Sequence, residues 1–96
     1  MFWSKVYRFK DEIVVAICDE ELLEKTLEFN DVKFHISKKF YGGNLINEEN
    51  AIKLMENSTI GNLVGKKIVS LALKKKYIAK ENIILISDVP HAQFIQ

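Results

Sequence analysis

Two apolar runs constrain the fold of this chain more than any other feature. The first covers Ile13 to Cys18, and the second fills the centre of the segment Asn82–Ser87. A run of successive apolar residues is typical of a strand that is buried on both faces of a sheet. We therefore expect both runs to be central strands. If the two strands are parallel, their carboxyl ends open on the same edge, where open α/β sheets bind ligands.

The remaining pattern predicts a small sheet covered by helices. Aromatic and basic residues alternate before the first run, Asn47 is typical of a helix cap, and Val32–Tyr41 alternates between apolar and polar residues. The expected elements are an edge strand over Lys5–Phe9, a strand over Ile13–Cys18, a helix from a cap at Asp19 to about Asn30, a strand over Val32–Tyr41, a helix from Asn47 to about Asn57, a long helix starting at Ser58 or Thr59, and a strand over Asn82–Ser87. This predicts an α/β (α+β) fold with a four-stranded mixed sheet, in the order strand, strand, helix, strand, helix, helix, strand.

Size and composition predict one domain spanning residues 1–96. The single cysteine, Cys18, excludes an intrachain disulfide framework, and together with only two histidines it argues against a zinc site. No apolar run approaches the roughly 20 residues of a membrane span, and the first residues lack a signal-peptide pattern. We expect a cytoplasmic protein that makes no membrane contact and has no metal or cofactor.

Charge is unevenly distributed along the chain. Fourteen basic and thirteen acidic residues give a net charge of +1, but most of the basic residues lie after residue 30. Lys66, Lys67 and Lys74 fall on the long helix expected there, and Lys39 and Tyr41 fall on the outer face of the third expected strand. Basic residues beside aromatic rings are typical of nucleic-acid contact, although a solvated surface is the simpler explanation.

Two glycines in the expected long helix invite comparison with a phosphate-binding loop. Gly61 and Gly65 are only four residues apart and lie within the helical pattern, so they do not have the spacing of a P-loop. Close packing of the helix against a neighbour is the better explanation.

A second set of candidates lies at the expected strand ends. Cys18 and Asp19 follow one apolar run, while His91 and Gln93 follow the other beyond Pro90; Tyr41-Gly42-Gly43 would join them at this edge. Cys18 with His91 would form a nucleophile–base pair if the strands were neighbours, with Asp19 as an acid or base. The structural alternatives are a small buried Cys18, a helix-capping Asp19, and a His91 that satisfies backbone carbonyls.

Several segments resemble a known family. These are Cys18-Asp19-Glu20-Glu21-Leu22, Phe40-Tyr41-Gly42-Gly43, Asn62-Leu63-Val64-Gly65 and the terminal Val89-Pro90-His91-Ala92-Gln93. Together they resemble the small archaeal family known as domain of unknown function 424, over nearly the whole chain. The resemblance implies an archaeal, cytoplasmic, one-domain protein and brings no reaction or substrate. Relatives often have glycine before Val-Pro-His, where this chain has Asp88.

The sequence therefore leads to a hypothesis and two alternatives. The hypothesis is a non-enzymatic protein that contacts RNA or a ribonucleoprotein such as the translation apparatus. The candidate binding residues are His91, Gln93, Tyr41, Gly42, Gly43, Asn62, Gly65, Lys66, Lys67, Lys74 and Lys39. One alternative is a small enzyme or ligand-binding domain that uses Cys18, Asp19, His91 and Gln93. The other is a protein-interaction module, including a homodimer through an edge strand or through Trp3 and Phe2.

Overall fold

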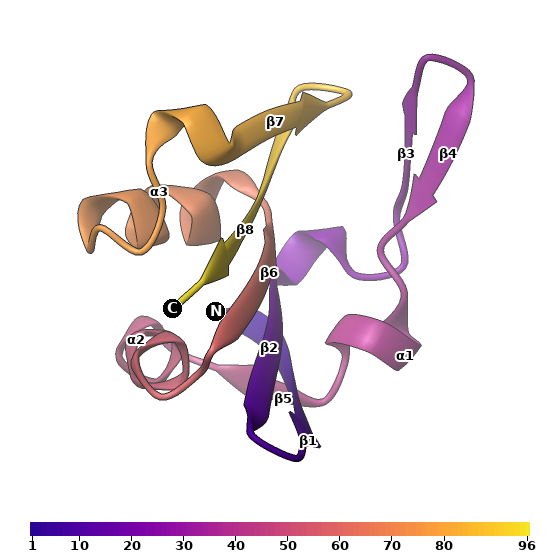
Figure 1. Cartoon of the computed structure of the whole chain (residues 1–96). Helices are drawn as coiled ribbons and strands as arrows, with labels where there is room; N and C mark the ends of the chain where they lie inside the picture. Colours follow the sequence, from indigo (N-terminus) through magenta and orange to yellow (C-terminus); the bar gives the residue numbers. More distant parts are fainter.

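A computed structural model describes all of residues 1–96 (Figure 1). Its strands are β1 (Phe2–Phe9), β2 (Glu12–Asp19), β3 (Thr26–Phe29), β4 (Val32–His35), β5 (Asn44–Ile46), β6 (Ile60–Val64), β7 (Ile83–Ile86) and β8 (Val89–Ile95). Its helices are α1 (Lys38–Tyr41), α2 (Glu48–Glu56) and α3 (Lys66–Lys74), with 3-10 turns η1 (Glu20–Leu22) and η2 (Lys80–Asn82). The chain is an α+β domain built on one large sheet.

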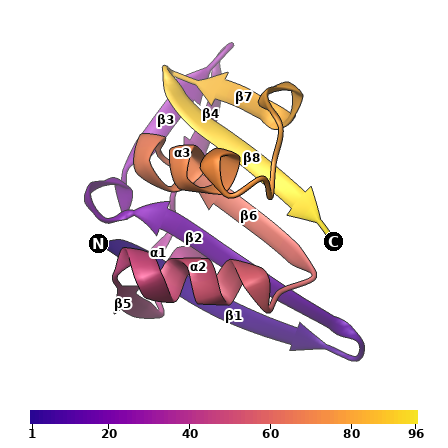
Figure 2. The same ribbon diagram turned by 90° about the vertical axis from the view of Figure 1, so that its left-hand side faces the viewer.

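The main sheet has six strands in the order β5-β1-β2-β6-β8-β7, and β3 and β4 form a separate hairpin. Only β2 and β6 are parallel neighbours; the other pairs in the sheet are antiparallel. Cys18 lies beside Val64, which in turn lies beside His91. The sheet therefore opens with β5 at one edge and ends with β7 at the other (Figure 2).

The two faces of the sheet bury separate cores. Helices α2 and α3 cover one face, where Ile17 and Leu63 of the sheet pack with Met55 and Ile68. The opposite face is covered by α1, η1 and the base of the β3–β4 hairpin. Its core, which we name the second core, is Ala16, Cys18, Val64, Ile36 and Tyr41. Residues of β2 alternate between these cores, which explains why its sequence is apolar at every position from Ile13 to Cys18.

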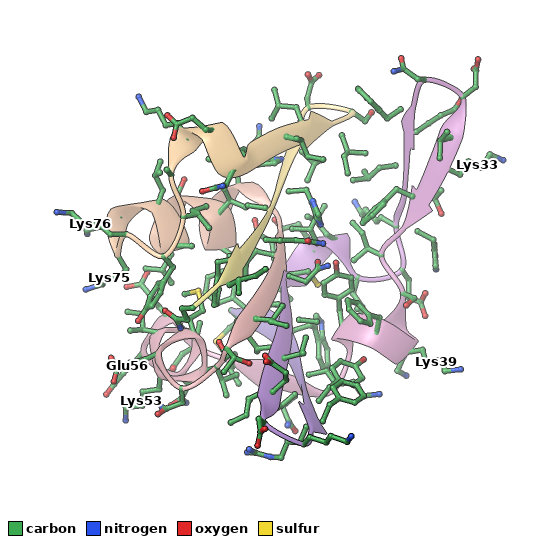
Figure 3. All side chains as sticks on the ribbon, in the orientation of Figure 1. Lys33, Lys39, Lys53, Glu56, Lys75 and Lys76 are labelled. Carbon is green, nitrogen blue, oxygen red and sulfur yellow. The ribbon has the colours of Figure 1, made fainter.

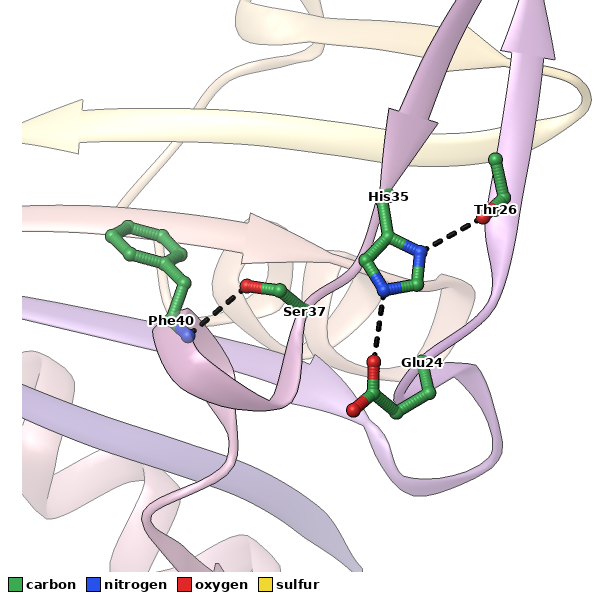
Figure 4. Close-up of polar contacts among 5 residues, drawn as sticks. All are labelled: Glu24, Thr26, His35, Ser37 and Phe40. Atoms are coloured by element: carbon green, nitrogen blue, oxygen red, sulfur yellow. Dashed lines mark hydrogen bonds and ion pairs between the residues drawn. The ribbon is translucent and has the colours of Figure 1, made fainter.

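Local signals set several of these elements. Asn47 caps α2, accepting a hydrogen bond from the Asn50 N–H at 2.9 Å. Ser37 caps α1 in the same way through the Phe40 N–H, at 3.1 Å (Figure 4). The β1–β2 hairpin and the helix after Asn47 were both predicted from the sequence and are confirmed.

The predicted four-stranded sheet and its element order are wrong. No helix runs from Asp19 to Asn30, because η1 ends at Leu22 and the chain continues into the β3–β4 hairpin. Asn30 and Asp31 both have positive φ, the conformation of a tight hairpin turn. The strand predicted over Val32–Tyr41 ends at His35, since the cap at Ser37 starts α1.

The long helix predicted from Ser58 or Thr59 is also wrong in its first half. Residues Ile60–Val64 form the central strand β6, and α3 begins only after Gly65. Gly61 lies under the Phe94 ring, where a Cβ would come within 2.0 Å of a ring carbon. The expectation of close packing at this glycine is correct, but the packing occurs on a strand.

The strand predicted over Asn82–Ser87 lies at an edge of the sheet. β7 pairs only with β8, formed by Val89–Ile95, a strand that the expected elements did not include. β7 runs in the same direction as β2, but β6 and β8 lie between them, so the expectation that both apolar runs are central strands is wrong for the second run. Gly65 donates its N–H to the Pro90 carbonyl at 2.9 Å and so ties the start of α3 to β8.

Candidate functional site

Asp19, at the end of β2, caps helix α3 from a distant part of the chain. Its carboxylate accepts hydrogen bonds from the N–H groups of Lys67 and Ile68, each at 2.9 Å. Gly65, the residue before α3, has φ of 124°, and a Cβ there would come within 2.3 Å of the Asp19 carboxyl carbon. Only glycine fits both the backbone conformation and the space, which explains why it occupies this position.

This contact fills the anion-binding end of α3. The free N–H groups of a helix N-terminus are a ready site for phosphate, and here a side-chain carboxylate already occupies them. Burial raises the pKa of Asp19, while the Lys67 and Ile68 N–H groups oppose that shift. The capping role of Asp19 was one of the sequence alternatives, but the helix that it caps is α3.

Cys18, on β2, is fully buried and forms part of the second core. Burial, together with the nearby Asp19 and Glu21 carboxylates, raises the pKa of its thiol to about 12. Val64 separates Cys18 from His91 in the register, which places the two about 9 to 10 Å apart at the usual strand spacing. The arrangement does not bring the two side chains together as a nucleophile and a base.

A chain of polar side chains crosses the second core beside these residues. The Tyr41 hydroxyl donates to the Asn62 Oδ1 at 2.6 Å, and the His91 Nε2 lies 3.3 Å from the same oxygen. The Phe34 ring meets His91 edge-on, with ring centroids 5.6 Å apart. Burial lowers the pKa of His91 and raises that of Tyr41, so both side chains are held neutral. These three polar residues link α1, β6 and β8.

Of the other predicted strand-end residues, Gln93 stays beside His91, with which it lines an open hollow of about 280 Å³, whereas Gly42 and Gly43 lie apart from them. Gly43 donates its N–H to the Ser4 carbonyl at 3.1 Å, and a Cβ at Gly43 would clash with that oxygen. Gly42 follows the end of α1, and Gln93 is exposed on β8 beside Asn62. The glycines therefore permit close backbone packing, and only Gln93 has a side chain that is free to meet a ligand.

The candidate lysines lie on two sides of the sheet. Lys66, Lys67 and Lys74 are exposed on α3. Lys39, labelled in Figure 3, is exposed on α1 across the sheet. An open groove of about 440 Å³ runs between α3 and the start of α2, lined by Lys67, Ser70, Lys74, Asn47 and Glu48 together with Met1, Phe2 and Leu71. The predicted RNA-binding residues thus do not share one surface.

A second basic surface is richer in aromatic rings. We name it the β1–α1 surface and define it as Lys5, Tyr7, Phe9, Lys39 and Phe40. The Tyr7 ring stacks with Phe40 at 5.4 Å and with Phe9 at 6.5 Å between centroids. Lys5 Nζ lies 5.6 Å from the centre of the Tyr7 ring and donates to the Lys39 carbonyl at 2.8 Å.

Sequence reasoning found only Lys39 of this surface. The alternation in Val32–Tyr41 predicts one strand, with Phe40 on its buried face and Tyr41 on its exposed face. Helix α1 reverses this, so that Tyr41 is buried and Phe40 is 36% exposed. The alternation of aromatic and basic residues in Lys5–Phe9 was the signal that could have located the surface.

The structure contains no group of three or more His, Cys, Asp or Glu side chains arranged to hold a metal ion. None of its helices combines the length and the apolar character that crossing a membrane requires.

Comparisons with known proteins identify a family and a fold. No curated protein matches the chain. A crystal structure described as that of an uncharacterized conserved protein from Methanopyrus kandleri is similar, with a TM-score of 0.80 and 25% sequence identity. That match covers 97% of this chain and 89% of the other. The family model described as "Protein of unknown function (DUF424)" matches residues 7–96. The chain therefore belongs to the DUF424 family.

Proposed function

We propose that this protein is a non-enzymatic binding module for single-stranded RNA, alone or within a ribonucleoprotein, and that it makes contact through the β1–α1 surface. The observation that carries the proposal is the set of stacked aromatic rings on that surface, flanked by lysines. Phe9 is 59% exposed and Phe40 is 36% exposed. Their rings stack with Tyr7, with Lys5 and Lys39 beside them.

The chemistry of the surface matches an unpaired strand of RNA. Stacking of a base on an aromatic ring contributes about 1–3 kcal/mol, and any base has a face that can stack. Lysine side chains beside the rings attract the phosphates that join successive bases. An open groove of about 280 Å³ lies along Lys5, Tyr7, Ser37, Lys39 and Phe40. Because the rings need splayed bases, the surface favours single strands over duplexes.

The α3 lysines are the weaker candidates for the same role. Lys66 and Lys67 are in the first turn of α3, where the helix dipole disfavours cations, and neither forms an ion pair. The groove beside Lys67 and Lys74 has one aromatic residue, Phe2, and that ring is buried. This surface offers charge without a platform for bases.

The enzymatic alternative has little support from the same geometry. Cys18 is buried with a raised pKa, Asp19 is committed to capping α3, and His91 is joined to Asn62 in a polar chain. Catalysis by this set would need an accessible nucleophile and a base within hydrogen-bond reach of it.

The test is binding of an unstructured oligoribonucleotide, followed by fluorescence anisotropy at several salt concentrations. Lys5→Ala/Lys39→Ala should weaken binding and lower the magnitude of the log–log salt slope by about 0.7 for each phosphate that the protein no longer neutralises. Phe9→Ala should weaken binding by about 1–3 kcal/mol, with little change in the salt slope.

Lys66→Ala/Lys67→Ala is the matched control, because it removes the same charge from the opposite side of the sheet. We expect it to bind almost as tightly as the wild type. A larger loss of affinity in this control than in Lys5→Ala/Lys39→Ala would place any RNA contact on α3 and contradict the proposed surface. No binding by the wild type at low salt would reject the RNA function itself.

A further inference from the structure

Strand β7 is an open and unprotected edge of the sheet. It pairs only with β8; apart from the Ile83 N–H, which donates to the Lys80 carbonyl in η2, its residues form no backbone hydrogen bond with another element. All four of its residues are apolar. Ile84 is 57% exposed on the face of His91, and Leu85 is 56% exposed on the opposite face beside Pro90. Exposed apolar edges of this kind are sites where further strands add.

The other edge of the sheet is guarded. β5 has only three residues, and it pairs with β1 at Phe2, Trp3 and Ser4. The rest of β1 leaves its edge unpaired but carries Lys5 and Arg8, with Lys10 directly after it. Charged side chains, lysine above all, are a usual protection of sheet edges against pairing. β7 has no such residue within its span.

The β3–β4 hairpin extends the β7 edge on one side. Leu27 and Phe34 at the middle of the hairpin pack into the second core, and Phe34 touches His91 of β8. Towards the tip, Phe29 and Val32 on the same face of the hairpin are 51% and 66% exposed. In Figures 1 and 2 this tip reaches past β7, so its apolar face overhangs the space beside the free edge.

The hairpin is held in that position at its base. His35 Nδ1 lies 2.8 Å from the Thr26 hydroxyl on the neighbouring strand, and His35 Nε2 lies 2.8 Å from a Glu24 carboxylate oxygen (Figure 4). Ile36, at the foot of the hairpin, is fully buried and exchanges backbone hydrogen bonds with Glu24 and Lys25. The overhang is therefore built into the fold.

A strand added beside β7 would satisfy all of these features together. It would pair with the free backbone groups, lie beneath Phe29 and Val32 on one face, and extend the surface of Leu85 on the other. Such a strand must be apolar on both faces, whereas a docked helix would cover only one face and leave the edge unpaired. β7 itself, with the sequence Ile-Ile-Leu-Ile, meets this requirement.

We propose that β7 pairs antiparallel with β7 of a second copy of this chain, so that two sheets join into one continuous sheet across a two-fold axis. Opposite residues of an antiparallel pair project to the same face, so the axis must pass through a residue position. With the axis at Ile84, Ile84 lies against Ile84 of the partner subunit. The hairpin tip of each copy then covers β7 of the other copy. The interface is self-complementary, as two-fold symmetry requires.

The test is the sedimentation of the full chain, without nucleic acid, over a wide range of protein concentrations. The wild type should shift from monomer to dimer as concentration rises. Leu85→Lys should remain monomeric, because it places a charge on the exposed edge, and Val32→Lys should weaken the dimer through the hairpin tip. Ile95→Lys is the matched control, since Ile95 is 83% exposed at the far end of β8, and it should dimerise like the wild type.

Hydrogen exchange of the wild type gives an independent measurement that needs no variant. Backbone amides of β7 should become more protected at high protein concentration, together with those of the hairpin tip. A monomer at every concentration would overturn the proposal, and the edge would then be open to a strand of a different protein. A dimer that persists unchanged in Leu85→Lys, or that protects β1 in place of β7, would overturn it equally.

Discussion

At the scale of single residues, His91 shows how burial decides the role of a chemically versatile side chain. Burial lowers the pKa of His91 below the usual value of about 6.5. At a pH between the folded-state and unfolded-state pKa values, the imidazole is therefore mostly neutral in the folded protein and mostly protonated in the unfolded chain. As pH falls from about 6.5 toward the folded-state pKa, the unfolded state takes up more protons than the folded state. The contribution of His91 to the free energy of unfolding is therefore present above this window and is lost as pH falls through it.

The comparison of the wild type with His91→Gln isolates this effect. Gln keeps a side chain that can hydrogen-bond to Asn62 but does not titrate. Urea unfolding at a series of pH values should show the wild type losing more stability on acidification than His91→Gln does. Parallel pH dependences for the two proteins would contradict the assignment and would place any acid sensitivity elsewhere.

At the scale of elements, the start of α3 depends on a residue from another strand. Asp19→Ala would leave the N–H groups of Lys67 and Ile68 without their acceptor, and Ile68 is buried. We expect a loss of about 1–3 kcal/mol in the free energy of unfolding, measured by urea denaturation. Asp19→Asn keeps one acceptor oxygen and should lose less. Glu20→Ala, one residue along and exposed, is the control and should stay within about 0.5 kcal/mol of the wild type.

A comparison of the starts of α2 and α3 shows what could and could not be predicted from the sequence. The start of α2 was predicted because its cap, Asn47, lies directly before it, and the β1–β2 hairpin was predicted from the alternation and apolar run within it. The start of α3 was missed because its acceptor, Asp19, is 48 residues away from Lys67 in the sequence. Gly61 was likewise read as part of a helix, since only the fold reveals the Phe94 ring against it. Of the β1–α1 surface the sequence supplied only Lys39, because the rings and lysine of β1 meet α1 only in the folded chain.

At the scale of the whole molecule, Cys18 reports on the cooperative unfolding of the sheet. The radius of gyration of 12.4 Å matches the roughly 12.5 Å expected for a compact chain of this length. Cys18 is fully buried in β2, a strand with a paired neighbour on each side. A thiol reagent reacts with the thiolate form of cysteine. In the folded state, burial keeps the reagent away from the Cys18 side chain, and a pKa of about 12 leaves little of it as thiolate. Labelling should therefore require the sheet to open.

We expect labelling of native Cys18 to be at least about a thousandfold slower than that of the unfolded chain, because stability of about 5 kcal/mol or more leaves so little open protein. The rate should rise with urea at the slope measured for global unfolding, since exposing a central strand requires the whole sheet to separate. Glu49→Cys, on the exposed side of α2, adds a thiol that should react at once in the same protein and so shows that the reagent is active. Rapid labelling of Cys18 in the native state, or a rate that does not depend on urea, would mean that β2 opens locally and that the two cores of the sheet do not unfold together.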